Sequence, residues 1–133
     1  MKRTLESLDD HFIDDDFFVR VQFDKADNFL KIIAALKELV PGGITFQFDE
    51  NGISLQEMDS SHIAIVAISI PGNGLSSYIC NKPQVVSIDI EKSWAFFKSV
   101  DKDAVIILSV STSDFLSVEI RSKSMFPLLI VTI

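Results

Sequence analysis

Four consecutive residues offer the groups of a hydrolytic site: an acid, two hydroxyls and an imidazole. They are Asp59, Ser60, Ser61 and His62, at the foot of an apolar segment that alternates like a strand. A Ser-His-Asp triad needs its side chains to converge in space, whereas neighbours on a strand point to opposite sides. The sequence contains neither a G-x-S-x-G elbow nor a glycine-rich oxyanion loop. The pattern therefore favours a polar turn, and no enzyme is predicted.

Metal binding is not predicted either. The only histidines are His11 and His62, which have no i, i+4 pairing, and the single cysteine, Cys80, is interpreted as a small apolar filler. The acidic run 14–16 lacks the glycine and the spaced ligands of a calcium loop. The sequence thus predicts no metal and no cofactor.

Strand-like and helix-like patterns follow one another in an order that occurs twice. The expected strands span 18–23, 44–48, 53–55, 62–70, 75–80, 85–90, 104–110, 115–121 and 125–133. One expected helix, capped by Asp24 or Asp27, runs to Val40, and the other spans 91–100. Apart from an additional short strand at 75–80, the order of strand, helix and three strands occurs twice, which indicates an internal duplication. We expect an α+β fold of antiparallel sheets with both helices packed on one face.

Both helices are amphipathic, and their polar sides carry lysines. The residues predicted to face the sheets are Phe29, Ile32, Ile33, Leu36, Leu39 and Val40 in the first helix, and Trp94, Phe97 and Val100 in the second. The outward lysines are Lys31, Lys37, Lys92 and Lys98. If the helices lie side by side, these lysines share one surface. On residue pattern alone, simple solvation of an exposed helix face is the better explanation.

Length and charge indicate one domain that is not basic as a whole. The chain has 133 residues and a formal net charge of −7. Residues 1–17 hold six acids against Lys2 and Arg3, and the expected domain, 18–133, holds ten bases against thirteen acids. The first segment is interpreted as a flexible solvated extension, or else as an acidic arm that covers a basic or apolar surface. Contact with a nucleic acid would need a local basic patch.

No targeting or membrane segment is predicted. The chain contains no run near the roughly 20 apolar residues of a membrane helix. Its first residues, MKRTLESLDDHF, lack the apolar region of a secretory signal. The expectation is an intracellular protein without a membrane partner.

Two stretches resemble a known family. Residues 52–66, GISLQEMDSSHIAIV, resemble the signature G-[VI]-x-L-Q-x-M-D-[SA]-S-H-[VI]-x-L-V of the eukaryotic-type DNA sliding clamps, the proliferating cell nuclear antigen family. Residues 30–40, LKIIAALKELV, are similar to the first inner helix of these clamps. The resemblance covers 18–133 and corresponds to the first, N-terminal domain of the two in a clamp subunit.

This resemblance implies a fold and a function. Each clamp domain is a duplicated β-α-β-β-β unit, with helices lining the inside of a ring and sheets forming its outside. The implied function is that of a DNA polymerase processivity factor, which surrounds duplex DNA through sequence-independent phosphate contacts and docks replication and repair proteins. Leu30 and Ala95 fall where the family usually has lysine. The DNA-facing residues implied are Lys31, Lys37, Lys92 and Lys98.

The resemblance also assigns a docking pocket. Met58, His62, Ile63 and Ile65 match positions that line the pocket for partner peptides of the type Q-x-x-[LIM]-x-x-[FY]-[FY]. Methionine and branched aliphatic side chains suit an adaptable apolar pocket. The family's connector between domains, which forms the other wall of this pocket, would begin near residue 133.

Ring closure in this family pairs edge strands of neighbouring subunits. That pairing maps to about 123–129, with Phe126 and Leu128 as interface residues, where Pro127 removes an amide donor. We expect either a separated first domain or a one-domain clamp that needs six copies to close a ring.

The resemblance implies partners and a compartment. The partners are double-stranded DNA, DNA polymerase and other proteins with clamp-binding peptides, a clamp loader, and further copies or partner subunits; the compartment is the nucleus or a viral replication compartment. An alternative of another class is a clamp-fold interaction or regulatory module, like a checkpoint clamp, that does not encircle DNA. A hydrolase using His62 is the third and least favoured interpretation.

Overall fold

A computed structural model describes residues 17–40, 42–111, 116–121 and 128–132, the last of these by their backbone. None of the helices within these ranges is long and apolar enough to cross a membrane. The predicted interface residue Phe126 lies outside the described residues.

The elements follow the predicted order closely. The helices are α3 (Ala26–Leu39), α4 (Ile90–Phe97) and the short 3-10 helix η2 (Gly72–Gly74). The strands are β1 (Val19–Phe23), β2 (Gly43–Asp49), β3 (Gly52–Met58), β4 (Ile65–Pro71), β5 (Ser77–Cys80), β6 (Gln84–Asp89), β7 (Val105–Val110), β8 (Leu116–Arg121) and β9 (Leu128–Thr132). One boundary differs in a way that matters for the site: the strand predicted from His62 starts at Ile65, because residues 59–64 form a turn.

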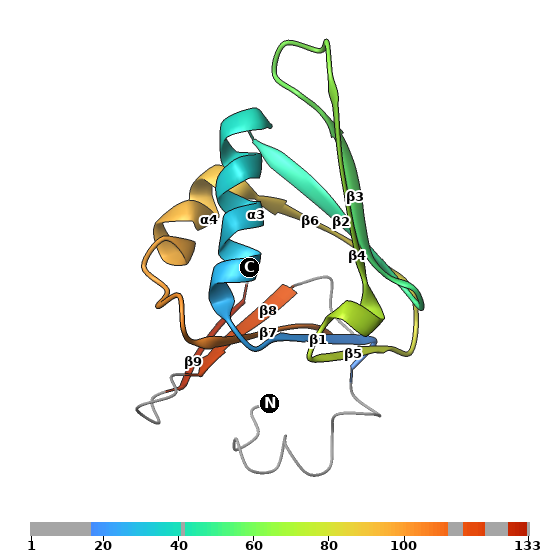
Figure 1. Cartoon of the computed structure of the whole chain (residues 1–133), viewed down its shortest axis with the longest axis vertical. Helices are drawn as coiled ribbons and strands as arrows, with labels where there is room; N and C mark the ends of the chain where they lie inside the picture. The colour runs from blue at the N-terminus through green and yellow to red at the C-terminus, as the bar shows by residue number, and fades with distance from the viewer. Residues whose placement is uncertain (1–16, 41, 112–115, 122–127, 133) are drawn as a thin grey trace.

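The strands form two antiparallel sheets that enclose the core together with the helix pair. The five-stranded sheet has the order β5-β1-β7-β8-β9, and the four-stranded sheet has the order β4-β3-β2-β6. Figure 1 shows α3 and α4 on one side, the four-stranded sheet on the opposite side and the five-stranded sheet across the bottom. The predicted α+β fold with antiparallel sheets and paired helices is confirmed.

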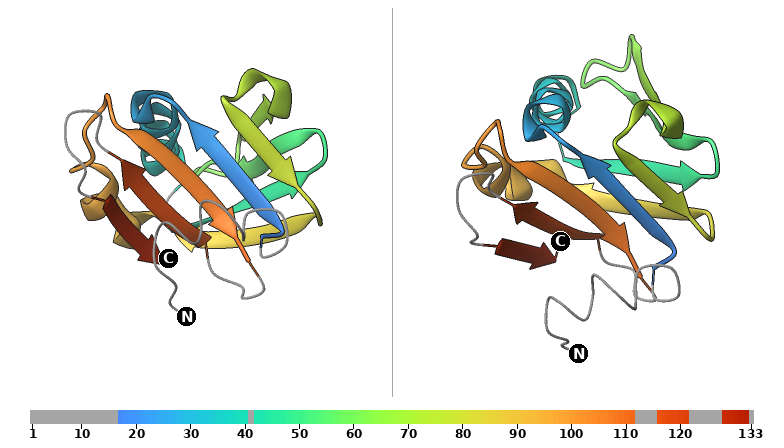
Figure 2. Two further views of the ribbon diagram at one scale, coloured as in Figure 1. Left: turned by 90° about the horizontal axis from the view of Figure 1, so that it is seen from below. Right: turned by 60° about the horizontal axis from the view of Figure 1, so that its bottom comes forward.

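The two halves exchange their first strands. Strand β1 precedes α3 but pairs with β7, in the register Val21↔Leu108, within the sheet of the second half. Strand β6 precedes α4 but pairs with β2, in the register Phe46↔Val86, within the sheet of the first half. The views from below in Figure 2 show β1 lying alongside β7. Each half therefore completes the other's sheet, and the two form one cooperative unit.

Alternating strand residues and helix faces meet in one apolar core. Phe29 of α3 lies near its centre, with its ring centroid 5.3 Å from that of Phe23, 6.5 Å from that of Phe46 and 5.6 Å from that of Phe97. These rings come from β1, α3, β2 and α4, so a single cluster joins both sheets to both helices. Tilted and edge-on aromatic contacts of this kind add to the free energy gained by burial.

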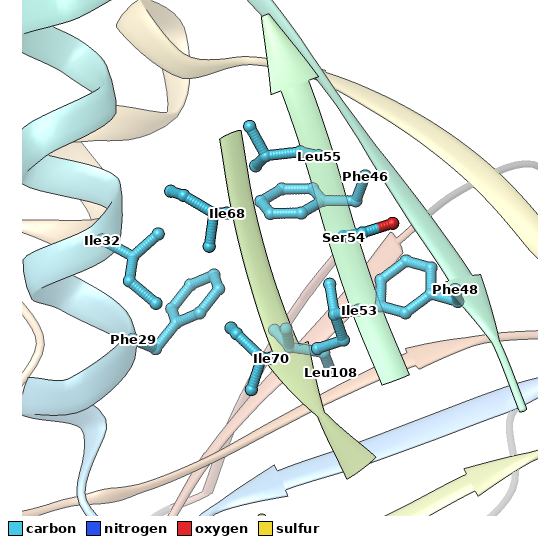
Figure 3. A pocket seen from close by; sticks show the side chains of 10 residues that line it. All are labelled: Phe29, Ile32, Phe46, Phe48, Ile53, Ser54, Leu55, Ile68, Ile70 and Leu108. Atoms are coloured by element: carbon cyan, nitrogen blue, oxygen red, sulfur yellow. The ribbon is translucent and has the colours of Figure 1, made fainter. Parts of the chain in front are cut away.

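A small apolar cavity remains between α3 and the four-stranded sheet. Figure 3 shows its lining, in which Phe29 and Ile32 face Ile68 and Ile70. Its volume of about 10 Å³ is at the lower limit for one water molecule. Because nearly all lining side chains are apolar, this space is a packing defect and not a ligand site.

Helix α3 begins without a side-chain cap, contrary to the prediction that Asp24 or Asp27 caps it. Lys25 occupies the N-cap position and makes no side-chain hydrogen bond there. Instead, the amide of Ala26 donates to the carbonyl of Ala104 (2.7 Å) and the amide of Asp27 donates to the carbonyl of Lys102 (3.1 Å). The turn after α4 thus satisfies amides that the helix leaves unpaired. Helix α4 has a side-chain cap, because Asp89 accepts from the amide of Lys92.

The predicted buried faces need one correction. Leu39 is 46% exposed, because it is the last residue of α3 and extends beyond the core. The remaining predicted positions are buried or are partly buried and packed against the core. Of the partly buried ones, Trp94 and Val100 also line the space between the two helices.

The hairpin between β2 and β3 depends on Gly52. Its φ of +148° lies in a region that side chains rarely adopt, and an added Cβ would overlap the backbone at Ile70 and Gly72. The Asp49 carboxylate accepts from the Gly52 amide at 3.2 Å, and the Tyr78 hydroxyl lies 2.8 Å from the Gly52 carbonyl. Tyr78 belongs to β5, so this contact joins the two sheets.

Replacing Gly52 with alanine should lower the free energy of unfolding by about 3 kcal/mol or more, through backbone strain and overlap with β4. Urea denaturation followed by circular dichroism would measure the loss. Gly74→Ala is the matched control, since no atom lies within 4 Å of its added Cβ. Equal stability of the two variants would contradict this account of the hairpin.

Candidate functional site

The Asp59 carboxylate organises the turn between β3 and β4. It accepts from the Ser61 hydroxyl (2.6 Å) and from the amides of Ile63 (3.0 Å) and Ala64 (2.9 Å). The Asp59 amide donates to the Ala64 carbonyl, and the His62 amide donates to the Asp59 carbonyl. The Ser61 hydroxyl and the Ala64 amide lower the pKa of Asp59 from 3.8 to about 2, because both stabilise its charged form.

These contacts support the prediction that the four residues form a polar turn, and they argue against a catalytic cluster. His62 has φ of +63° and an exposed side chain. Among the hydrogen bonds of the described residues, none joins its imidazole to Ser61 or Asp59. A carboxylate with a pKa of about 2 is also a weak base. The four polar residues therefore shape a turn, and the arrangement needed for acyl transfer is not formed.

The turn carries exposed apolar side chains. Met58 and Ile65 face each other across β3 and β4, so both lie on the sheet surface turned away from the core. Their exposed fractions are 49% and 60%, and that of Ile63 in the turn is 87%. The predicted docking residues Met58, His62, Ile63 and Ile65 are thus close in the chain and all exposed. We refer to these four residues as the docking wall.

The docking wall is tied to the end of α3. The Ser60 amide donates to the Leu39 carbonyl at 3.1 Å. That carbonyl belongs to the last residue of the helix, where acceptors have no partner inside the helix. The position of the turn is therefore coupled to the position of α3.

A groove runs between α3 and α4. Its lining joins the first turns of α3 to the last turn of α4 and the turn that follows. The lining residues are Asp27, Leu30, Lys31, Ala34, Trp94, Phe97, Lys98, Val100 and Lys102. We call this feature the interhelical groove. Apolar side chains and three lysines meet in it, so it is a cationic surface with an apolar floor.

The four lysines predicted to face DNA differ in their surroundings. Lys31 and Lys98 line the interhelical groove, and the Lys31 ammonium forms an ion pair with Asp27 at 3.1 Å. The Lys37 ammonium lies 5.7 Å from the centroid of the Trp94 ring, which is a cation–π geometry. Lys92 is exposed on the first turn of α4 and does not line the groove.

Two residues of the groove were missed in the sequence analysis. Trp94 was assigned to the core, and Lys102 was interpreted only as part of a turn. The assignment of Trp94 to the core could have been questioned, because a bulky side chain beside outward lysines can face either the core or the helix surface. Lys102 gave no local signal, because its place depends on the hydrogen bond from Asp27 in the other half.

Metal and redox chemistry find no support in the described part of the chain. No group of three or more potential ligands occurs among the described residues. Cys80 is partly buried, and desolvation raises the pKa of its thiol, which lowers its reactivity.

Strand β9 forms one edge of the five-stranded sheet. Leu128, the predicted interface residue, is its first residue and lies opposite Arg121 of β8. The other side of β9 pairs with no strand among the described residues.

Comparison with known proteins identifies the family. The family described as "Proliferating cell nuclear antigen, N-terminal domain" matches residues 18–125. The chain belongs to this family. The match confirms the resemblance seen in the signature 52–66 and in the first helix.

Individual relatives agree with this family membership. The chain is 31% identical over 93 residues to proliferating cell nuclear antigen 2 of Drosophila melanogaster, covering 69% of this chain and 36% of that protein. It is 29% identical over 106 residues to the DNA polymerase sliding clamp of Cenarchaeum symbiosum (strain A), covering 80% of this chain and 42% of that protein. The chain thus spans less than half the length of these relatives.

A solved structure agrees with the fold. The proliferating cellular nuclear antigen from Entamoeba histolytica superposes with a TM-score of 0.79 at 23% identity, covering 88% of this chain and 46% of that one. At this identity the likeness establishes the sliding-clamp fold of the chain.

Replacing Asp59 with alanine should release the amides of Ile63 and Ala64. In the unchanged protein the lowered pKa means that the carboxylate supports the turn fully above pH 3.8 and loses this effect as the pH falls through about 2. NMR spectra of the two amides should therefore change over this acid range, and Asp59→Ala should show the changed signals at neutral pH. Asp103→Ala is the control, and an unaffected turn in Asp59→Ala would contradict the role given to Asp59.

Proposed function

We propose that this chain acts as a DNA sliding-clamp domain, a non-enzymatic processivity factor that surrounds duplex DNA and docks other proteins. The observation that carries the proposal is the joint cationic surface of α3 and α4, in a member of the proliferating cell nuclear antigen family. Several relatives of this chain are named DNA polymerase sliding clamps, which supports a DNA polymerase as a partner.

DNA contact would come from the lysines of the helix pair, Lys31, Lys37, Lys92 and Lys98. An ammonium group at the end of a flexible stem attracts phosphate without reading bases, so such contacts carry no sequence information. They also weaken with salt, because binding releases counterions. Weak, uniform contacts of this kind suit a protein that moves along DNA.

Partner docking would use the docking wall. An apolar partner side chain that covers Met58, Ile63 and Ile65 would remove exposed hydrocarbon surface from water. His62 would add a polar contact beside them. The docked segment would be a short peptide with aliphatic and aromatic anchors, as the signature of the family implies.

Assembly into a ring would pair the free side of β9 with an edge strand of the next subunit, with Phe126 and Leu128 at the contact. Edge pairing satisfies backbone groups that a free strand leaves exposed to water. One-domain subunits would need six copies, whereas a chain that continues into a second domain would need three.

The proposed setting is DNA replication and repair. A clamp loader would open the ring, since a closed ring cannot thread onto circular DNA. The nucleus or a viral replication compartment would be the site of action, and relatives of this chain include proteins of Drosophila melanogaster and of a nuclear polyhedrosis virus.

A second candidate function is an interaction or regulatory module that keeps the clamp fold and the docking wall but does not encircle DNA, in the manner of a checkpoint clamp. Leu30 favours it, because this apolar residue lines the interhelical groove at a position where the family usually has lysine. Ala95 on α4 lacks a usual lysine in the same way. A measurement of DNA binding distinguishes the two candidate functions.

Replacing Lys31, Lys37, Lys92 and Lys98 together with alanine should abolish retention on circular DNA. The slope of log affinity against log salt should fall by about 3.6 per contacting domain, since each phosphate contact contributes roughly 0.9. Binding of a clamp-binding peptide should be unchanged. A chain that light scattering shows to be monomeric at all concentrations, and that circular DNA does not retain, would contradict the ring and favour the second candidate.

Replacing Ile63 with aspartate should weaken peptide binding by about 2 kcal/mol, or roughly thirtyfold, because a charge would replace an apolar contact. Fluorescence anisotropy of a labelled peptide of the type Q-x-x-[LIM]-x-x-[FY]-[FY] would measure it. The control is Val85→Asp, which places the same charge at a 68% exposed apolar residue of β6, away from the docking wall. Equal effects of the two variants on peptide binding would contradict the proposal that the docking wall binds partner peptides.

A further inference from the structure

The hairpin of β3 and β4 extends beyond the part of the sheet where β2 supports it (Figure 1). The pairing of β2 with β3 ends at Gln47↔Ser54, whereas the pairing of β3 with β4 continues to Met58↔Ile65. Residues 55–68, which we call the extended part of the hairpin, therefore pair only with one another among the described strands. The docking wall lies on this part, so its position depends on contacts other than the ladder with β2.

The Glu57 carboxylate takes the place of the missing ladder. The amide of Thr45 in β2 is directed towards β3, where it donates to Oε2 of Glu57 at 2.8 Å. On the other side of β2, Thr45 lies opposite Ser87 of β6, and the two hydroxyl oxygens are 2.8 Å apart. In an antiparallel sheet a backbone carbonyl of the neighbouring strand would accept from such an amide. Here a side-chain acceptor bridges β2 and the extended part of the hairpin.

Glu57 is suited to this contact by its face and by its charge. Leu55 and Glu57 point to the same face of β3, and Leu55 is only 3% exposed. Glu57 thus faces inward at the rim of the core, where it is partly buried. A charged acceptor makes a stronger hydrogen bond to an amide than a neutral one. The family signature leaves position 57 open, so membership of the family does not imply this contact.

Two hydrogen bonds join the extended part of the hairpin to other elements of the described chain. One is the bond from the Thr45 amide to Glu57, and the other is the bond from the Ser60 amide to the Leu39 carbonyl at the end of α3. The first attaches the hairpin to the sheet, and the second attaches its turn to the helix. A binding surface keeps its geometry when supporting hydrogen bonds of this kind hold it from more than one side.

We propose that Glu57 is a positioning residue for partner docking, because its carboxylate holds the hairpin against β2 and so keeps the docking wall in the orientation that a partner peptide needs. The inference rests on the proposed docking function and adds to it a residue outside the docking wall. Met58 follows Glu57 but points to the opposite face of β3, so Glu57 acts through the backbone and does not contact the peptide. A wall that is correctly placed for only a fraction of the time binds with an affinity reduced by that fraction.

Variants of Glu57 separate the geometry of this contact from its charge. Glu57→Gln keeps an acceptor oxygen at the same reach, Glu57→Asp keeps the charge but withdraws it by one methylene group, and Glu57→Ala removes both. In Glu57→Ala and Glu57→Asp, the amides of Thr45 and Ser60 should exchange with deuterium about tenfold faster, because a hydrogen bond to a charged acceptor contributes at least that factor. Glu57→Gln should stay close to the unchanged protein. Hydrogen exchange followed by NMR would measure these rates.

Peptide binding measures the effect on docking. The affinity for a labelled peptide of the type Q-x-x-[LIM]-x-x-[FY]-[FY] should fall about tenfold in Glu57→Ala and Glu57→Asp, which corresponds to about 1.4 kcal/mol. Glu57→Gln should recover most of this loss. The loss should appear in the association rate constant with the dissociation rate constant unchanged, because a misplaced wall is available less often but binds equally well once in place.

The control is Gln56→Ala, which truncates an exposed neighbour on the same strand whose side chain points to the opposite face. This variant should exchange and bind like the unchanged protein. Near-UV circular dichroism would establish that each variant is folded, and the comparison of Glu57→Asp with Glu57→Gln remains decisive if Glu57→Ala is not.

Three results would overturn the proposal. The first is unchanged exchange of the Ser60 amide in Glu57→Ala and Glu57→Asp. The second is an equal loss of affinity in Glu57→Gln and Glu57→Asp. The third is a loss that appears in the dissociation rate constant, which would make Glu57 a direct contact of the peptide. If the unchanged protein does not bind the peptide, the proposed docking function fails, and the exchange rates alone decide whether Glu57 positions the hairpin.

Discussion

Strand β1 lies between β5 and β7, and β6 lies beside β2, so each half of the chain completes the sheet of the other half. Neither half can bury its own apolar strand faces without the other, because the side chains of Val21 and Leu108, or of Phe46 and Val86, meet only across this exchange. The helices follow from the same constraint. Each helix is connected directly to an exchanged strand, and α3 and α4 lie side by side across the core from the four-stranded sheet (Figure 1).

Backbone hydrogen bonds, as well as apolar contacts, hold the two helices together. Helix α3 lacks a side-chain cap, and its first amides donate to the carbonyls of Lys102 and Ala104 in the turn that follows α4. An unsatisfied buried amide costs about 1–3 kcal/mol, so this docking stabilises one relative position of the halves. The contact of Phe29 with Phe97 stabilises the same position from the core side. A cationic groove with a defined shape is the result.

Much of the fold could be predicted from periodicity, because strands with one buried face and amphipathic helices carry their pattern in the local sequence. The lysines of the helices were found in the same way, whereas the docking role of the apolar residues near His62 came only from the resemblance of residues 52–66 to the family signature. The features that were predicted wrongly or were missed depend on contacts between distant segments of the chain. The cap of α3, the place of Trp94 in the groove and the role of Lys102 each need residues from both halves. The start of β4 was placed too early, because the Asp59 carboxylate binds the amides of Ile63 and Ala64 that a strand would have used.

The two candidate surfaces share one structural support. Helix α3 presents Lys31 and Lys37 on its outer side, and its final carbonyl, that of Leu39, accepts from the Ser60 amide in the turn that carries the docking wall. The Asp59 hydrogen bonds hold the turn together internally, and the hydrogen bond from Ser60 to Leu39 fixes one end of the turn relative to the end of α3. The exposed apolar side chains of Met58, Ile63 and Ile65 and the lysine-bearing face of α3 are therefore positioned by one connected set of hydrogen bonds.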